Sequence, residues 1–325
     1  MTTTGGEAGA ATGGGQEAPG VTFRTGLYPE MSDAIYHGDP CPAPSLSSGL
    51  IRTLTTGTPR HAWLAHPRLG KSEDKASTKA QDYGSLVHKL ALGAGRDVEI
   101  IEADSYRTKA AQEQRDAAQA AGRIPILEPA YADALAQAEP IRDAITALAG
   151  EGWQGEVAMI GQRETAHGTI WTRAKADALS ADRSVIVDLK TTQKLDDKAI
   201  KNRLAEYDTQ DVHYRATLES ARSDLIGRTR FVFLFIENST GIMRPVGLSE
   251  GWRHAADLAV TEAAETFARC LKARQWPAYA AAPELFEPPP WLVRARLEKA
   301  CASVADDHHD TDHQPTDDDD RPDLF

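Results

Sequence analysis

The stretch that decides the fold is Val185-Ile-Val-Asp188-Leu-Lys190-Thr-Thr192, an apolar strand pattern that ends with an acid and a lysine two residues apart. Side chains at positions i and i+2 of a strand point to the same face of the sheet, so we expect Asp188 and Lys190 side by side. The same acid-x-lysine spacing occurs at 73–75 and 196–198, but only the copy at Asp188 follows a buried-type strand. For any single copy, a structural ion pair is the alternative interpretation.

The strand before it, Trp171-Thr-Arg-Ala-Lys-Ala-Asp177, ends in a second acid. A tight turn between the two strands would let Asp177 and Asp188 converge. Two converging carboxylates are the hard oxygen ligands that Mg²⁺ or Mn²⁺ prefers. Lys190 would then lie where it can hold a water molecule and offset charge developing on a phosphate.

The remaining periodicity predicts helices and short strands. Helices are expected from Ser45 to Leu54 and over 80–92, 106–122, 129–149, 197–207, 209–223 and 252–273, and strands over 156–164, 169–179, 184–190, 230–236 and 241–246. Helices before, between and after the strands indicate an α/β fold, a sheet covered by helices with a helical N-terminal half.

The composition excludes several classes of protein. The chain has 325 residues, of which 41% are hydrophobic, and it lacks both a transmembrane-length apolar run and a secretory signal pattern. We therefore expect a cytoplasmic protein that does not enter a membrane. Its three cysteines, Cys41, Cys270 and Cys301, are too few and too widely spaced for a disulfide framework or a four-cysteine metal site.

The net charge of −12 is concentrated at the chain ends. From Cys301 onward there are nine aspartates against one arginine, and Glu7 and Glu17 account for two further negative charges, so residues 21–300 are almost neutral. Residues 1–20 and 301–325 are poor in apolar side chains and are expected to be disordered. Residues 21–300 are expected to form one composite domain.

These motifs resemble the PD-(D/E)XK nuclease superfamily, whose core is an acid followed by (D/E)xK, matched here by Asp177 and by Asp188-Leu-Lys190. Gly84-Ser-Leu-Val-His88 is similar to the GxxxH helix of the RecB-like branch, and Gln210-Asp-Val-His-Tyr214 to its QxxxY helix. The Asp-Leu-Lys-Thr-Thr form of the core and the segment Leu46–His61 look most like the RecE-type exonuclease domain, exodeoxyribonuclease VIII. The resemblance covers about residues 28–275 and implies a restriction-endonuclease-like fold with a central mixed β-sheet flanked by helices.

The resemblance implies a role for each matched residue. Asp177, Asp188 and the Leu189 carbonyl would ligate the metal, Lys190 would assist the water, and His88 would bind metal or phosphate. Gln210 and Tyr214 would orient DNA or the surrounding side chains, or would simply brace a helix against the sheet.

Two positions near this core remain open. Glu156, at the start of the first strand, matches the place where the superfamily often has an additional acid, and Glu164 is its rival. Ala176 replaces the proline that gives the superfamily its name.

Basic residues surround the predicted site and would contact DNA phosphates, or would serve only as a solvated helix face. They are Arg173, Lys175, Arg183, Lys190, Lys194, Lys198, Lys201 and Arg203. The acidic tail ends in Arg321-Pro-Asp-Leu-Phe325, which is similar to short clamp-binding peptides but is more simply a solubilising segment.

The resemblance implies a phage or prophage exonuclease that uses Mg²⁺, with Mn²⁺ as the alternative ion. It would digest linear double-stranded DNA from 5′ ends and leave a 3′ single strand for recombination by a single-strand annealing protein. A homo-oligomeric ring, a trimer or a tetramer, is implied as well. The alternatives are a DNA-end-binding module without turnover and a Cas4-like or repair-type single-strand nuclease, which the missing cysteines disfavour.

Overall fold

The structure is a computed structural model that describes residues 22–70, 79–93, 97–238, 240–280 and 282–307. The predicted N-terminal tail at 1–20 and the acidic stretch 308–325 lie outside the described residues. The chain divides into two units, one ending at Ala278 and one beginning at Tyr279.

The second unit contains helix α9 (Pro290–Asp307). This helix runs past residue 301, where the tail was predicted to begin. The difference has a local cause, because Leu297-Glu-Lys-Ala-Cys-Ala is rich in residues of high helix propensity.

The first unit is built on a mixed seven-stranded sheet with the order β1-β5-β6-β7-β8-β9, to which β2 adds by pairing with β6. Its strands are β1 (Gly26–Tyr28), β2 (Ser45–Leu46), β5 (Gln154–Arg163), β6 (Ile170–Leu179), β7 (Val185–Thr192), β8 (Arg230–Glu237) and β9 (Met243–Val246). Strands β5, β6 and β7 form an antiparallel meander, and β8 lies parallel to β7. The predicted central mixed sheet is confirmed.

The helices of the first unit are α1 (Asp33–His37), α2 (Ser48–Thr56), α3 (Pro59–Ala65), α4 (Lys79–Leu92), α5 (Lys109–Ala120), α6 (Glu128–Ala149), α7 (Asp197–Ala221) and α8 (Glu250–Ala273), with a 3-10 turn at Ser223–Leu225. We predicted two helices where α7 is continuous. Residues 207–209 contain neither glycine nor proline, so nothing in the backbone chemistry breaks the helix there.

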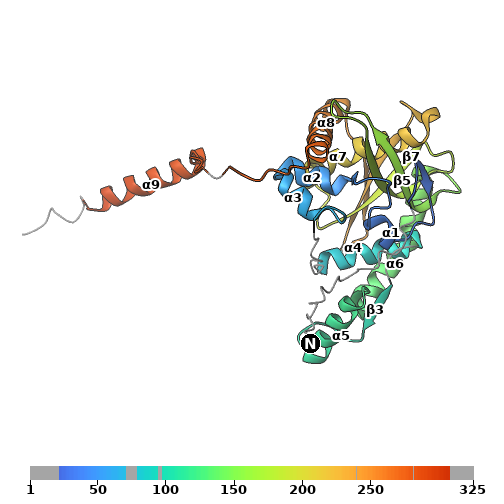
Figure 1. Ribbon diagram of the computed structural model, residues 1–325. Coiled ribbons are helices and arrows are strands. Elements are labelled where there is room, and N and C mark those ends of the chain that lie inside the picture. The colour runs from blue at the N-terminus through green and yellow to red at the C-terminus, as the bar shows by residue number, and fades with distance from the viewer. Residues whose placement is uncertain (1–21, 71–78, 94–96, 239, 281, 308–325) are drawn as a thin grey trace, which may run out of the picture. The chain divides into compact units, whose positions relative to one another are not determined.

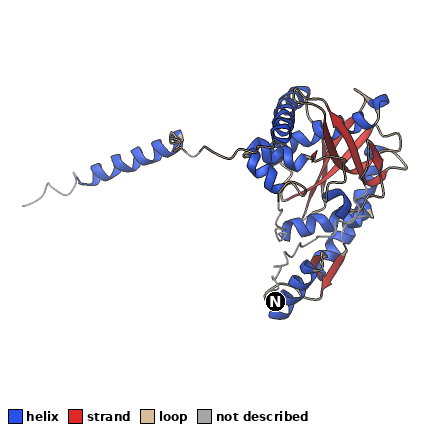
Figure 2. Ribbon diagram, in the orientation of Figure 1, coloured by secondary structure: helices blue, strands red, loops and turns tan. Residues whose placement is uncertain are grey.

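Helices cover both faces of the sheet, as Figures 1 and 2 show. On one face, α7 packs through Leu204, Tyr214 and Leu218 onto a core that includes Phe231 and Phe233 of β8. On the other face, α4 and α6 pack through a separate cluster of apolar side chains, to which β7 contributes Val185, Val187 and Leu189. Both faces of β7 are therefore buried, which explains why its sequence is almost continuously apolar instead of alternating.

The N-terminal half is less purely helical than predicted. Strands β3 (Val98–Ile101) and β4 (Ile124–Leu127) form a small parallel sheet of their own, joined by α5. Strands β1 and β2 were also missed, since segments of two or three residues are too short for an alternating pattern to be recognised. None of the described helices is both long and apolar enough to cross a membrane.

Candidate active site

A tight turn joins β6 to β7 and is stabilised by its own polar side chains. Asp182 Oδ1 accepts hydrogen bonds from Ser180 Oγ at 2.6 Å and from the Ser184 backbone amide at 2.9 Å. Arg183 adopts the left-handed conformation with φ of 69°, which closes the turn. The turn predicted between the two acid-bearing strands is therefore present, and it sets their ends close together.

Strands β6 and β7 diverge soon after this turn. Their backbone pairing ends at Ala178 with Val187, and β2 pairs with the earlier part of β6 instead. At the point of divergence, Asp177 Oδ2 accepts a hydrogen bond from the Leu189 amide at 2.7 Å. The Asp177 carboxylate thus takes the place of the backbone carbonyl that would pair with the Leu189 amide in a continuous sheet. This hydrogen bond fixes Asp177 at the fork, the point where β6 and β7 separate.

Helix α4 brings His88 to the same fork. A Cβ atom on Gly84 would lie 3.2 Å from Thr191 Oγ1, so the absence of a side chain lets α4 approach the end of β7 closely. One turn further along, His88 Nε2 lies 3.2 Å from the Leu189 carbonyl oxygen and Nδ1 lies 3.6 Å from Asp177 Oδ1. Because a carbonyl only accepts, Nε2 carries the proton in this arrangement, and the Nδ1 lone pair faces Asp177.

Glu156 joins the group from β5. The register pairs Gly155 with Ala178 and Val157 with Ala176, so Glu156 lies between these pairs, beside Asp177. Its backbone adopts φ of 56°, a conformation that costs a non-glycine residue about 1–3 kcal/mol. His88, Glu156 and Asp177 each offer one ligand atom, and these three atoms lie within 4.8 Å of one another. Side chains from one helix and two adjacent strands therefore converge on one point.

Asp188 and Lys190 lie beside this group and contact each other, as their i, i+2 spacing predicts. Asp188 is buried and accepts a second hydrogen bond from Gln210 Nε2 at 2.5 Å. The ammonium of Lys190 lies 4.8 Å from the centre of the Tyr207 ring. The oxygens of Asp188 are thus held by Lys190 and Gln210 in the described structure, next to the group formed by His88, Glu156 and Asp177.

Burial governs the electrostatics of the site. It raises the pKa of Asp188 to about 6, against the opposing charge of Lys190, and it raises the pKa of Asp177 as well. The pKa of Glu156 is raised by burial and then by the neighbouring Asp177. Burial followed by the charge of Lys190 lowers the pKa of His88, so the imidazole is neutral and able to act as a ligand.

Gln210 and Tyr214 occupy different environments, although both project from α7. Gln210 reaches the site through Asp188, whereas Tyr214 is buried in the core, with its ring centroid 5.9 Å from that of Phe231. A hydrogen bond links the Tyr214 side chain to Ser48 of α2. Tyr214 therefore packs between α7 and the sheet, and its predicted role toward DNA stays a prediction.

Two of the cations predicted to contact phosphate are inside the fold. Arg173 is 5% exposed and is bound to Asp39 and Ser45. Lys175 is paired with Glu156 and with Asp33. The cations that remain exposed near the end of β7 are Lys194, Lys198 and Lys201.

Sequence reasoning missed the role of Lys175. It stands two residues before Asp177 on β6, so the alternation of the strand places both on the same side, and this signal was available. Its partner Asp33 lies 142 residues away in sequence, and no local pattern connects the two.

The donor set suits a divalent cation. Glu156 and Asp177 supply carboxylate oxygens, His88 supplies a neutral imidazole nitrogen, and the three are already close together. Burial raises the pKa of both carboxylates, and the charge of Asp177 raises that of Glu156 further, so a bound cation would stabilise the ionised pair. The residues therefore fit the metal that the sequence predicts.

This combination of features defines a PDDEXK-like domain: acid-bearing strands that diverge beside an acid-x-lysine pair, with a histidine helix and a glutamine helix next to them. The family model described as "PDDEXK-like domain of unknown function (DUF3799)" matches residues 56–287, and the chain belongs to that family. The match covers the whole candidate site.

A solved structure shares this fold. A protein from Eubacterium rectale described as a "putative exonuclease" aligns with a TM-score of 0.50 at 14% identity, over 76% of this chain and 90% of its own. A second structure, SSO0001, aligns with a TM-score of only 0.26 at 12% identity, over 65% of this chain and 84% of its own, and carries no weight. No curated protein matches the chain.

Proposed function

We propose that this protein is a metal-dependent nuclease that hydrolyses phosphodiester bonds of DNA. The observation that supports this most directly is the convergence of His88, Glu156 and Asp177 within 4.8 Å, beside the paired Asp188 and Lys190. A purely structural ion pair would not require three further ligand-type side chains from α4, β5 and β6 at the same point.

His88 Nδ1, Glu156 and Asp177 would hold the metal, with Asp188 and the Leu189 carbonyl completing the set. Mg²⁺ is the proposed ion and Mn²⁺ the alternative, which the imidazole ligand makes easier to accommodate. When bound, such an ion polarises the phosphate and lowers the pKa of water. Leu189 would bind the ion through its backbone carbonyl oxygen. His88 contacts that oxygen and Asp177 accepts from the Leu189 amide, so the Leu189 backbone is already held in place.

Lys190 would hold and orient the attacking water through its ammonium and would offset charge that develops on the phosphate. Its neighbours keep it charged: burial alone would lower its pKa, but the charges of Asp188 and Asp177 outweigh this and raise it. Gln210 keeps Asp188 in place by donating to its other oxygen. Gln210 thus acts on the reaction by positioning Asp188.

The proposed type of nuclease, with its substrate and polarity, rests on the RecE-type resemblance of the sequence. The fold shared with the "putative exonuclease" from Eubacterium rectale supports it. We propose a cytoplasmic exonuclease on linear double-stranded DNA that starts from 5′ ends and produces 3′ single strands for recombination. A single-strand annealing protein as partner and a ring-like oligomer belong to the same proposal.

The test uses the purified full-length chain with linear and closed circular duplexes of one sequence, labelled at the 5′ or the 3′ end, with Mg²⁺, Mn²⁺ or EDTA. The proposal predicts metal-dependent release of mononucleotides from linear DNA, starting at the 5′ end, and no cutting of the circle. Equal cutting of both would indicate an endonuclease. Binding of DNA ends without cleavage in either metal would support the DNA-end-binding module instead.

A further inference from the structure

Lys175 forms ion pairs with two acids, Asp33 and Glu156, and Glu156 belongs to the candidate metal site. Its ammonium lies 2.5 Å from Glu156 Oε2 and also contacts Asp33 Oδ1 of α1. The side chain is 11% exposed, so these contacts are shielded from solvent. Burial alone would lower the pKa of Lys175, but its two carboxylate partners raise it, so it stays charged.

The contact engages one oxygen of the Glu156 carboxylate. Lys175 binds Oε2, which leaves Oε1 to bind an ion. The Glu156 backbone is in the left-handed conformation, which a non-glycine residue adopts only where the surrounding structure holds it. Lys175 is the described partner of that carboxylate.

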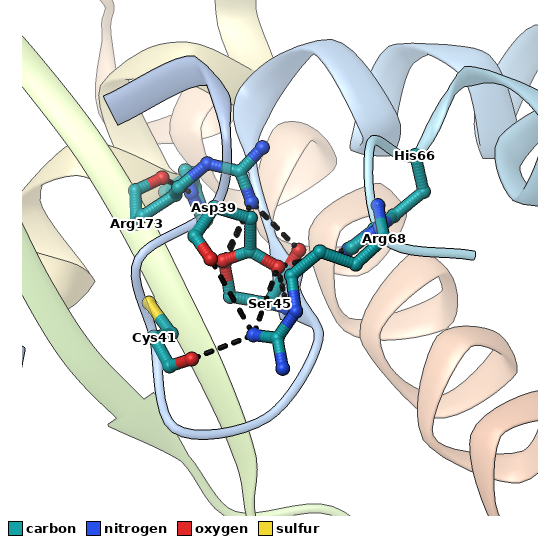
Figure 3. Close-up of polar contacts among 7 residues, drawn as sticks. Asp39, Cys41, Ser45, His66, Arg68 and Arg173 are labelled. Atoms are coloured by element: carbon teal, nitrogen blue, oxygen red, sulfur yellow. Dashed lines mark hydrogen bonds and ion pairs between the residues drawn. The ribbon is translucent and has the colours of Figure 1, made fainter. Parts of the chain in front are cut away.

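Asp33 is also held next to β6 by the contacts of a nearby residue. The segment between α1 and β2 contacts β6 a second time through Asp39. Figure 3 shows Asp39 surrounded by Arg173, Ser45, His66 and Arg68. Asp39 Oδ1 lies 3.2 Å from Arg173 Nη1 and accepts from Ser45 Oγ at 2.6 Å.

The other Asp39 oxygen, Oδ2, lies 3.2 Å from His66 Nε2, and both side chains are fully buried. Arg68 Nη1 donates to the Cys41 carbonyl oxygen at 2.6 Å and so closes the loop that follows Asp39. The segment from α1 to β2 is therefore held on β6 at two alternate positions, Arg173 and Lys175, and the next alternate position is Asp177.

We propose that Lys175, anchored by Asp33, is a positioning residue that fixes the Glu156 carboxylate toward the bound divalent cation. The inference rests on the metal site of the proposed function. Asp33 balances most of the charge of Lys175, so the effect of the pair on the ion is mainly geometric. Removing both members together therefore removes the positioning without changing the net charge.

The experiment measures binding of Mn²⁺ alone by electron paramagnetic resonance, with no DNA present. The double variant Asp33→Asn/Lys175→Met is expected to weaken Mn²⁺ binding about 10- to 100-fold, the range typical for loss of a residue that orients a metal ligand. The matched control is Arg222→Met/Asp224→Asn, which removes an exposed ion pair of 2.8 Å and is expected to leave Mn²⁺ binding unchanged. Thermal unfolding of each variant identifies any that does not fold.

A double-mutant cycle separates positioning from a general structural role. If Lys175 acts through Glu156, then in the Glu156→Gln background the Asp33→Asn/Lys175→Met change should have no further effect on Mn²⁺ binding. An equal loss in both backgrounds, or unchanged Mn²⁺ binding in a folded double variant, would overturn the inference. Wild-type protein that binds Mn²⁺ but cleaves no DNA would refute the proposed function and leave this inference standing.

Discussion

Replacing Gly84 with alanine tests whether close approach of α4 to β7 is needed for activity. The new Cβ would lie 3.2 Å from Thr191 Oγ1, closer than ordinary contact, so one of the two must move by a few tenths of an ångström. Alanine favours a helix over glycine by about 1 kcal/mol, while overpacking costs about 1–3 kcal/mol. The free energy of unfolding should therefore fall by no more than about 2 kcal/mol.

The effect on catalysis should be larger than the effect on stability. His88 stands one turn beyond Gly84, and its Nε2 is already 3.2 Å from the Leu189 oxygen, so a small displacement of α4 breaks that hydrogen bond. Misplacement by about 1 Å can cost about 100-fold in rate, so a shift of a few tenths should cost roughly tenfold. The assay is single-turnover cleavage of linear DNA at saturating metal, alongside chemical denaturation.

Two further variants make this prediction specific. Thr191→Ala removes the oxygen that clashes, so Gly84→Ala/Thr191→Ala should regain the activity of Thr191→Ala alone. Gly251→Ala is the matched control, because a Cβ atom on this glycine of α8 would meet no atom of the described residues within 4 Å, and the added methyl group should cause no loss of activity. Full activity of Gly84→Ala, or a loss that Thr191→Ala does not relieve, would refute the reasoning.

Three other predictions follow from the same structure. Lys190→Met should lower the cleavage rate at least about 100-fold while Mn²⁺ binding by the protein alone stays within a few-fold of wild type; loss of Mn²⁺ binding instead would make Lys190 a structural residue. Reversal of two exposed charges, Lys194→Glu/Lys198→Glu, should weaken DNA binding in about 50 mM salt more than in about 200 mM salt, and equal weakening at both would exclude phosphate contacts. His213 is buried beside Arg173 and Arg163, and burial lowers its pKa from 6.5 to about 4. Because the folded-state pKa is the lower one, the contribution of His213 to the free energy of unfolding should be fully present above about pH 6.5 and fall by about 3 kcal/mol towards about pH 4. Denaturant unfolding of His213→Gln should lack that part of the pH dependence, whereas the exposed His254→Gln should retain it.

The core of the site could be predicted because it obeys local rules. The i, i+2 spacing of a strand placed Asp188 beside Lys190, and the i, i+4 spacing of a helix placed Gly84 and His88 on one side of α4. The short segment between Asp177 and Asp188 indicated the turn that brings β6 and β7 together. Each of these inferences needs only a few neighbouring residues.

The rest depends on contacts between distant segments. Nothing in the sequence of β6 shows that its pairing with β7 ends at Ala178, or that β2 pairs with its earlier part. Arg173 and Lys175 look like surface cations until Asp39 and Asp33 are placed against them. The left-handed conformation of Glu156 is likewise imposed by the assembled sheet, since glutamate itself disfavours it.

The measurement that tests the central claim most directly is metal-dependent cleavage by Asp177→Asn beside the control Asp143→Asn. Asparagine keeps the shape of Asp177 and can still accept from the Leu189 amide, so the fold should survive while one charged ligand is lost. Asp143 is an exposed acid of α6 outside the site. We predict that Asp177→Asn loses at least about 100-fold in single-turnover rate and weakens Mn²⁺ binding, while Asp143→Asn matches wild type. Wild-type cleavage and Mn²⁺ binding by a folded Asp177→Asn protein would contradict the assignment of this site.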